Sequence, residues 1–382
     1  MRFFTKRLTL LAVLLWAVAG AKAQWIEFEV DGIRYSIFES SSEDKSVKVI
    51  RDLYEGDIVI PETVAYEGET YAVTQIEAWA FTDCMNLRSV TIPNSVTVIG
   101  ESAFGGCIGL TTVEIPASVT SISGDVFSAC TNLASIEVDE GNTVYTSIDG
   151  VLYSKDKKTL CCVPPKSTFQ GIPDFVTVIG EFAFSYCTDL TSLEIPSTVE
   201  SIGRCAFFEC SGLTSLKIPS SVEYIGGYAF SYCMGLTSLE IPSSVNSIEA
   251  GVFFWCRGLT SLKIPSSVNS IGEYAFTGCS GLTSLDIPSS VVSIRDFAFQ
   301  GCSGLTSLKI PSSVNSISIC AFSYCTGLTF LDIPSSVVSI GDYAFEGCDS
   351  LTSVKLPPAL KTLGDFAFPY SIYNHRTTKT NQ

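Results

Sequence analysis

Histidine is almost absent from this sequence of 382 residues, in which His375 is the single example. Catalysis by a histidine-activated nucleophile or a histidine general base is therefore not expected. No glycine-rich phosphate loop is present, and Cys161 and Cys162 are adjacent, with no second cysteine pair at a metal-binding spacing. We expect no catalytic residue, no cofactor and no metal site, and hence a protein that is not an enzyme.

Positive charge is also scarce. The chain has 23 Lys and Arg residues against 39 Asp and Glu residues, a formal net charge of −16. Such a surface repels nucleic acids and anionic lipids, so neither is an expected partner.

Long apolar runs are missing except near the N-terminus. The segment Leu8–Ala19 is shorter than the roughly 20 residues of a membrane span. Positive residues precede it, and Ala21-Lys22-Ala23 follows as a small-residue cleavage site before Gln24. Residues 1–23 are typical of a secretory signal peptide. We expect an exported protein, at the cell surface, extracellular or periplasmic, with no membrane insertion after cleavage.

Cysteine, by contrast, is abundant, and most of the 15 cysteines recur with a period of 23 residues. The skeleton is I-P-x-x-V-x-x-I-G-x-x-A-F-x-x-C-x-x-L-x-x-L-x-I-P, shown by residues 266–288 and their neighbours. A fixed period of this length predicts a solenoid, in which each coil buries its apolar face against the next. The Phe-x-x-Cys mark falls at Cys84, Cys107, Cys130, Cys187, Cys210, Cys233, Cys256, Cys279, Cys302, Cys325 and Cys348.

These equivalent cysteines are expected to form a buried column of free thiols. Adjacent coils lie about 4.8 Å apart at strand spacing. The side chains then point in parallel, whereas a disulfide requires Cβ atoms about 3.8 Å apart. Cys205 and Cys320 are five coils apart, about 24 Å along the stack, and cannot bridge within one molecule. The redox states of Cys161, Cys162, Cys205 and Cys320 stay open.

Three segments depart from the repeat. Residues 24–75 alternate apolar and polar positions around turns at Asp31-Gly32 and Glu67-Gly68, which predicts an N-terminal β cap. Coils occupy 76–130 and 172–370, and residues 131–171 between them carry hairpin signals, including Asp149-Gly150. We expect this insertion to be a β-hairpin excursion that projects from the stack. The polar tail 371–382 is expected to be disordered.

Within one coil, Leu-x-x-Leu-x-Ile-Pro predicts a strand, Val-x-x-Ile-Gly a second extended arc, and Ala-Phe-x-x-Cys a short helical or 3₁₀ turn with Phe in the core. The A-F-x-x-C and S-L-x-I-P-x-S-V elements together, across residues 76–370, resemble the BspA-like family of bacterial surface leucine-rich-repeat proteins. The resemblance implies a curved leucine-rich-repeat solenoid, a parallel β-sheet on one face, and binding to host or partner proteins in adhesion. No binding residue follows from it.

The exposed strand position between Leu and Ile alternates in charge sign through eight coils. Opposite charges at strand spacing stabilise a sheet, and like charges destabilise it. We therefore interpret the column as a structural ion ladder rather than as a binding strip. Its members are Glu194, Lys217, Glu240, Lys263, Asp286, Lys309, Asp332 and Lys355.

Aromatic residues recur at two positions near the turns. Trp79, Phe182, Tyr228, Tyr274, Phe297, Tyr343 and Phe366 precede Ala-Phe, whereas Tyr186, Tyr232, Trp255 and Tyr324 precede Cys. Phe330 interrupts a serine column on the strand. Aromatic residues are favoured at interfaces, although regular rows of them can also cover the turns between coils. The candidate binding surface is Tyr186, Tyr228, Tyr232, Trp255, Tyr274, Tyr324, Phe330 and Tyr343.

The expected function is binding of a protein ligand, such as a host matrix or surface protein. Two alternatives stay open: a carbohydrate-binding module that uses the aromatic rows, and a structural envelope protein that associates with itself.

Overall fold

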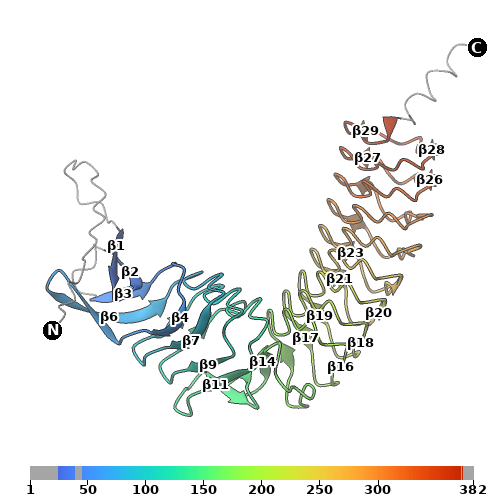
Figure 1. The fold of residues 1–382 in the computed structure, drawn as a ribbon. Helices are drawn as coiled ribbons and strands as arrows, with labels where there is room; N and C mark the ends of the chain where they lie inside the picture. Colours follow the sequence, from blue (N-terminus) through green and yellow to red (C-terminus); the bar gives the residue numbers. More distant parts are fainter. Residues whose placement is uncertain (1–24, 39–44, 371, 373–382) are drawn as a thin grey trace, which may run out of the picture.

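The computed structural model describes residues 25–38, 45–370 and 372. The expected signal peptide and nearly all of the expected disordered tail lie outside these residues. The chain forms one long arch of stacked coils, with β1 at one end and β29 at the other (Figure 1). The predicted solenoid is confirmed.

Two antiparallel β-hairpins form the N-terminal end of the solenoid. Strands β1 (Trp25–Val30) and β2 (Ile33–Phe38) form a hairpin whose turn, Asp31-Gly32, has φ values of 52° and 81°. β5 (Thr63–Tyr66) and β6 (Glu69–Ile76) form a second hairpin at Glu67-Gly68, where φ is 50° and 85°. β3 (Ser46–Val49) pairs with β2 on one side and in parallel with β6 on the other, which connects the hairpins to the solenoid.

Two parallel ladders of short strands run along the arch. The first is formed by the Leu-x-Ile segments. In the second arm of the arch, which runs from β16 to β29, these segments lie on the outer side (Figure 1). Its strands are β4 (Gly56–Val59), β7 (Leu87–Thr91), β9 (Thr112–Ile115), β11 (Ser135–Val138), β16 (Ser192–Glu194), β18 (Ser215–Lys217), β20 (Ser238–Glu240), β22 (Ser261–Lys263), β26 (Phe330–Asp332) and β28 (Ser353–Lys355). The isolated bridges Asp286↔Lys309 and Lys309↔Asp332 extend the ladder from β26 back to Asp286.

The second ladder is formed by the Val-x-x-Ile segments, usually two residues long in each coil. Its strands are β8 (Val98–Ile99), β10 (Ser121–Ile122), β15 (Val178–Ile179), β17 (Ser201–Ile202), β19 (Tyr224–Ile225), β21 (Ser247–Ile248), β23 (Ser270–Ile271), β24 (Ser293–Ile294), β25 (Ser316–Ile317), β27 (Ser339–Ile340) and β29 (Thr362–Leu363). The isoleucine of each pair is buried in the core, except that Ile122 is only partly buried and the terminal strand β29 has the exposed Leu363 at this position.

A column of phenylalanine rings fills the core between the ladders. Phe184, Phe207 and Phe230 are fully buried, and their ring centroids are 5.0 Å and 5.3 Å apart with nearly parallel planes. The same stacking runs from Phe253 through Phe345 to Phe368. Each coil therefore buries its large side chain against the equivalent ring of the next coil, as the 23-residue period predicts.

The insertion does not project from the stack as expected. β12 (Tyr145–Ile148), β13 (Val151–Ser154) and β14 (Thr159–Cys162) form an antiparallel meander, and β14 then pairs in parallel with β15. Its third strand therefore occupies the Val-x-x-Ile position of a coil, because burying Leu160 there continues the core. The two hydrophobic cores of the molecule meet at this meander, between the two arms of the arch (Figure 1).

Candidate binding surface

The Ala-Phe-x-x-Cys segment, expected to be a short helical or 3₁₀ turn, forms consecutive tight turns that include left-handed residues. Its N–H groups alternate in direction: Phe182, Phe184 and Tyr186 donate to carbonyl oxygens of the next coil at 3.0, 2.7 and 2.8 Å. The N–H groups of Ser185 and Cys187 donate to carbonyl oxygens three residues back, within the same coil. The turns therefore form a third hydrogen-bonded ladder along the arch.

This alternation places two residues of nearly every turn in the left-handed region. One precedes Ala-Phe and the other precedes Cys, and φ at both lies between 46° and 75°. All eleven turn aromatics singled out from the sequence occupy such positions. They are Trp79, Phe182, Tyr186, Tyr228, Tyr232, Trp255, Tyr274, Phe297, Tyr324, Tyr343 and Phe366.

Aromatic side chains are costly at these positions. A left-handed φ destabilises a residue that carries a Cβ atom by about 1–2 kcal/mol, and glycine avoids this cost. Several coils do use glycine at the same places, including Gly251, Gly278 and Gly347. The stack can therefore be built with glycine, so backbone geometry alone does not account for the aromatic residues.

The aromatic side chains of six successive turns form a continuous series of contacts. Tyr186 contacts Phe208, Phe208 contacts Tyr232, and Tyr232 contacts both Phe254 and Trp255, with ring centroids 5.5–6.2 Å apart. The contacts continue at 4.8–6.4 Å between Phe254, Tyr228, Tyr274 and Phe297. We call the set of eight the aromatic strip: Tyr186, Phe208, Tyr228, Tyr232, Phe254, Trp255, Tyr274 and Phe297.

Glycines in the following coil make room for several of these rings. A Cβ atom added to Gly251 would lie 2.2 Å from the ring of Tyr228, and one added to Gly278 would lie 3.1 Å from the ring of Trp255. Gly347 accommodates Tyr324 in the same way, at 2.5 Å. Each ring thus lies over the turn of the next coil and partly covers it, which is also what the structural interpretation of the rows predicts.

Charged groups border the strip. The guanidinium of Arg257 lies over the ring of Trp255, 4.1 Å from its centroid. Outside the strip, but in the turn that contains Tyr186, the ring centroid of Phe182 lies 5.9 Å from the Arg204 guanidinium. Glu209 occupies a left-handed position between Tyr186 and Tyr232 in the same row. Partial burial raises the pKa of the Glu209 carboxyl, and burial likewise raises the pKa of the Tyr186 hydroxyl. The strip therefore combines aromatic area with a few poorly solvated polar groups.

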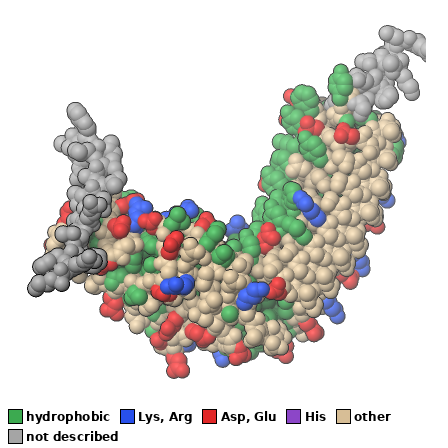
Figure 2. All heavy atoms as spheres, viewed as in Figure 1, with side chains coloured by type: hydrophobic (Ala, Val, Ile, Leu, Met, Phe, Trp, Pro, Cys, Tyr) green, Lys and Arg blue, Asp and Glu red, His purple; other side chains and the backbone are tan. Residues whose placement is uncertain are grey.

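Five of the eight candidate residues belong to the strip: Tyr186, Tyr228, Tyr232, Trp255 and Tyr274. Tyr324 and Tyr343 lie in later turns and are more exposed, at 50% and 37%. Phe330 is apart from them all, since it belongs to β26 on the outer ladder, where it pairs with Ser353. Figure 2 shows hydrophobic side chains gathered along the inner side of the arch, over the coils of the second arm.

Sequence reasoning missed Phe208 and Phe254. They follow the core residues Phe207 and Phe253 directly, 46 residues apart, and are half-buried links between the rows. The doubled phenylalanines of F-F-E-C and F-F-W-C were the signal that could have identified them.

The charge column follows the predicted register. Glu194 pairs with Lys217, Lys217 with Glu240, and Glu240 with Lys263 across adjacent strands. The Lys263 Nζ atom lies 3.1 Å from a carboxylate oxygen of Glu240. The column faces outward, away from the concentration of hydrophobic side chains (Figures 1 and 2).

All fifteen cysteines are free thiols, and those of the repeated column are buried. Burial raises the pKa of the Cys256 and Cys302 thiols to about 12, so neither forms a thiolate readily. Across the described ranges 25–38, 45–370 and 372, no group of three or more His, Cys, Asp or Glu side chains is arranged to hold a metal ion. Within the same part of the chain, no helix is both long and apolar enough to cross a membrane.

The sequence profile of the "BspA type Leucine rich repeat region (6 copies)" matches residues 69–155, 166–283 and 250–375. The chain belongs to this BspA-type leucine-rich-repeat family. The resemblance inferred from the A-F-x-x-C and S-L-x-I-P elements is therefore confirmed.

Two solved structures, with TM-scores above 0.5, show the same fold as this BspA-type chain, and a third is similar over most of its length. A leucine-rich repeat protein from Bacteroides ovatus is 30% identical, with a TM-score of 0.51, over 88% of this chain and 90% of the other. One from Eubacterium ventriosum is 22% identical with a TM-score of 0.57, over 88% and 98%. A protein from Faecalibacterium prausnitzii described as a leucine rich cell surface protein is 24% identical with a TM-score of 0.49, over 91% and 97%. No curated protein matches the sequence.

Proposed function

We propose that this chain is an exported, non-enzymatic BspA-type repeat protein that binds a host or partner protein through the aromatic strip, in adhesion at the bacterial cell surface. The observation that carries the proposal is the occurrence of eleven aromatic residues, six of them in the strip, at left-handed positions that glycine fills in neighbouring coils. A feature that lowers stability and persists at many equivalent places is best explained by a use at the surface.

The composition of the strip supports a protein ligand. Tyrosine, tryptophan and arginine dominate the residues that contribute most to protein–protein affinity. The strip provides four tyrosines, Trp255 and the adjacent Arg257 on a rigid scaffold, so few side chains must be immobilised on binding.

The carbohydrate alternative has weaker support. Sugar stacking requires a free aromatic face, but the Trp255 ring lies against Gly278 and beneath Arg257. Several other rings of the strip meet edge to face, including Tyr232 with Phe254. Export is supported by the segment 1–23 of the sequence alone.

The test measures binding of the mature chain, beginning at Gln24, to immobilised host matrix and surface proteins by surface plasmon resonance. A double substitution, Tyr232→Ala with Trp255→Ala, should weaken binding by about tenfold or more, as is typical of central aromatic contacts. Phe330→Ala is the matched control, because Phe330 is 53% exposed but lies on the outer ladder.

Loss of glycan-array binding in the double variant, with no protein ligand found, would favour the carbohydrate alternative instead. Concentration-dependent self-association in light scattering that the double variant abolishes would favour the structural alternative. Equal loss of binding in Phe330→Ala would remove the strip from the binding site. Circular dichroism of each variant establishes that the solenoid is still folded.

A further inference from the structure

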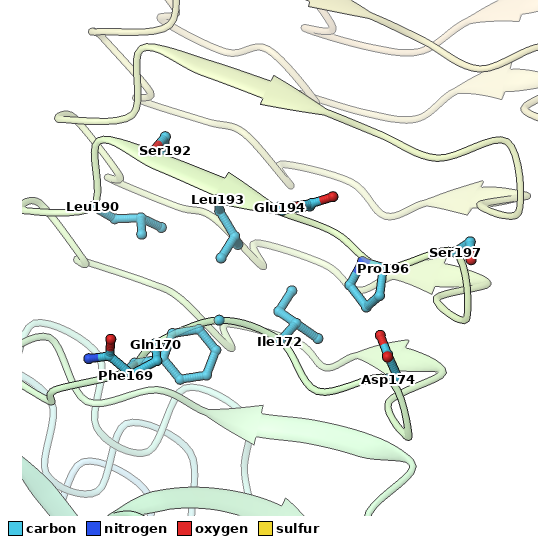
Figure 3. A pocket seen from close by; sticks show the side chains of 11 residues that line it. Phe169, Gln170, Ile172, Asp174, Leu190, Ser192, Leu193, Glu194, Pro196 and Ser197 are labelled. Atoms are coloured by element: carbon cyan, nitrogen blue, oxygen red, sulfur yellow. The ribbon is translucent and has the colours of Figure 1, made fainter.

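The outer strand ladder is interrupted at the junction of the two arms. β11 pairs only with β9, and β16 pairs only with β18, within the part of the chain that the structure describes. Residues 168–172 are the repeat equivalents of the missing strand, but they run alongside β16 across a groove and do not pair with it (Figure 3). Among the described residues, no hydrogen bond joins this segment to β16. Gly171, with φ of 143°, marks its departure from strand geometry.

The interruption leaves a groove of about 830 Å³ beside β16. Leu190 and Leu193 on one side, and Phe169 and Ile172 on the other, provide its apolar lining, and Leu193 and Ile172 point toward each other (Figure 3). Leu190 is partly exposed, whereas the equivalent leucines of the next six coils are fully buried: Leu213, Leu236, Leu259, Leu282, Leu305 and Leu328. The groove therefore exposes core surface that a neighbouring strand covers elsewhere. Its volume is within the 300–1,000 Å³ range of ligand sites.

The edge of β16 also offers backbone hydrogen-bonding groups. In the following coils, the Thr214 N–H donates to Thr191 O and the Thr237 N–H donates to Thr214 O, both at 3.1 Å. The Thr191 N–H has no such acceptor from residues 167–173, since the described part of the chain contains no hydrogen bond between them. An unpaired strand edge of this kind binds extended peptides by strand addition.

Charge indicates which peptide fits. Glu194 begins the alternating column, with Lys217 on one side and Gly171 at the equivalent position on the other. Asp174 adds a second carboxylate to the lining, which contains no Lys or Arg. The nearby Lys166 already pairs with Asp189 at 2.5 Å. A strand placed beside β16 in the register of the ladder would therefore need a basic residue opposite Glu194.

We propose that this groove binds an extended segment of a partner protein, in which a Lys or Arg stands between apolar residues, as an added strand on the free edge of β16. The apolar residues cover Leu190 and Leu193, and the basic residue pairs with Glu194. The proposal concerns the outer face and does not depend on ligand binding by the aromatic strip.

The chain itself supplies a matched pair of probes. The hexapeptide Thr-Ser-Leu-Lys-Ile-Pro has the sequence of residues 214–219, and Thr-Ser-Leu-Glu-Ile-Pro has that of 191–196. Each is labelled with fluorescein and titrated with the mature chain by fluorescence anisotropy. The lysine peptide should bind about three- to tenfold more tightly than the glutamate peptide, because a cross-strand pair changes from attractive to repulsive.

Glu194→Lys should reverse this preference, so that the glutamate peptide binds more tightly. Glu240→Lys is the control: it makes the same charge change in β20, whose two edges are paired, and should leave the preference unchanged. A lysine peptide with N-methylated backbone amides should bind at least about tenfold more weakly, because strand pairing needs those amides.

Three results would overturn the proposal. One is the absence of binding by either peptide up to millimolar concentration, and another is a preference that Glu194→Lys does not change. The third is a dimer of the unliganded chain that Glu194→Lys dissociates, which would make a second copy the occupant of the groove. Thermal unfolding of both variants establishes that the ladder is intact.

Discussion

The thiol of Cys256 donates a hydrogen bond to the carbonyl oxygen of Phe230, 3.0 Å away in the preceding coil. The same bond links Cys210 to Phe184 and Cys279 to Phe253, at 3.0 Å in both cases. Each cysteine is thus both a small apolar side chain and a donor that holds one coil to the coil before it. This dual role accounts for cysteine, rather than alanine or serine, at the repeated position.

Cys256→Ala should destabilise the protein, because it removes the thiol hydrogen bond and leaves a small void. We expect a loss of about 1–3 kcal/mol, measured as the free energy of unfolding in urea. Cys256→Ser restores a donor in a smaller side chain and should lose less than Cys256→Ala. Cys320→Ala is the control, since Cys320 is partly exposed and lies outside the column. Equal losses at Cys256 and Cys320 would contradict a structural role for the column.

Alkylation should distinguish the column from the remaining cysteines. Burial raises the pKa of the Cys256, Cys302 and Cys348 thiols to about 12, and their sulfurs are shielded from solvent. With iodoacetamide at pH 8, the native protein should react first at Cys320, whose thiol is partly exposed. The column should react only after denaturant is added. Peptide mass spectrometry measures the order, and early labelling of Cys256 would show that the stack opens locally.

The regular part of the fold could be predicted from sequence because one physical requirement repeats in every coil. Phe184 and Cys210 recur at fixed spacing because each must fill the same space in the core. The pairing of Glu194 with Lys217 likewise followed from strand spacing and charge sign alone. Stacking places equivalent residues of successive coils next to each other, so the 23-residue period also predicts which strand residues pair.

The irregular part could not be predicted in the same way. Tyrosine and tryptophan normally avoid the left-handed region, so the sequence at Tyr232 and Trp255 gives no sign of this conformation. Only the glycines at equivalent positions, such as Gly278, indicate it. The open edge of β16 was hidden because Ile172-Pro173 resumes the repeat in register. Whether residues 168–172 pair with β16 depends on how β14 enters the coil, which is a tertiary constraint.

Tyr324 offers a direct measure of the left-handed cost. Its φ is 57°, its ring lies over Gly347, and half of the side chain is exposed. Tyr324→Ala loses the ring contact but keeps the unfavourable Cβ atom, whereas Tyr324→Gly removes both. The glycine variant should therefore be more stable than the alanine variant by about 1 kcal/mol. Urea unfolding measures the difference, and the same two substitutions at Phe330, in β26, should give the opposite order.

The charge column should respond to reversal and to salt. Lys263→Glu places three acidic residues in succession with Glu240 and Asp286. We expect a loss of about 0.2–1 kcal/mol for each like-charged pair created. Lys263→Gln removes the attraction without adding repulsion and should lose less. Raising ionic strength from 0.1 to 1 M shortens the Debye length from about 10 to about 3 Å and should bring the two variants together. A gap that salt does not change would exclude charge as its cause.

Glu209, which lies between Tyr186 and Tyr232, should make the stability of the protein depend on pH. Partial burial raises the pKa of this carboxyl above its ordinary value of 4.5, so the folded protein binds the proton more tightly than the unfolded chain does. Protein stability should therefore fall as pH rises from 4.5 through the folded pKa, and then stay at the lower level. Glu209→Gln removes the charge and should be more stable than the wild type at pH 7, with the gap closing as pH is lowered below 4.5. Thermal unfolding across pH 4–8 measures this gap.

Glu223→Gln, at a solvent-exposed carboxylate, is the control and should match the wild type at pH 7. A Glu209→Gln variant less stable than the wild type at pH 7 would mean that the charged carboxylate stabilises the strip, by an interaction that outweighs its burial.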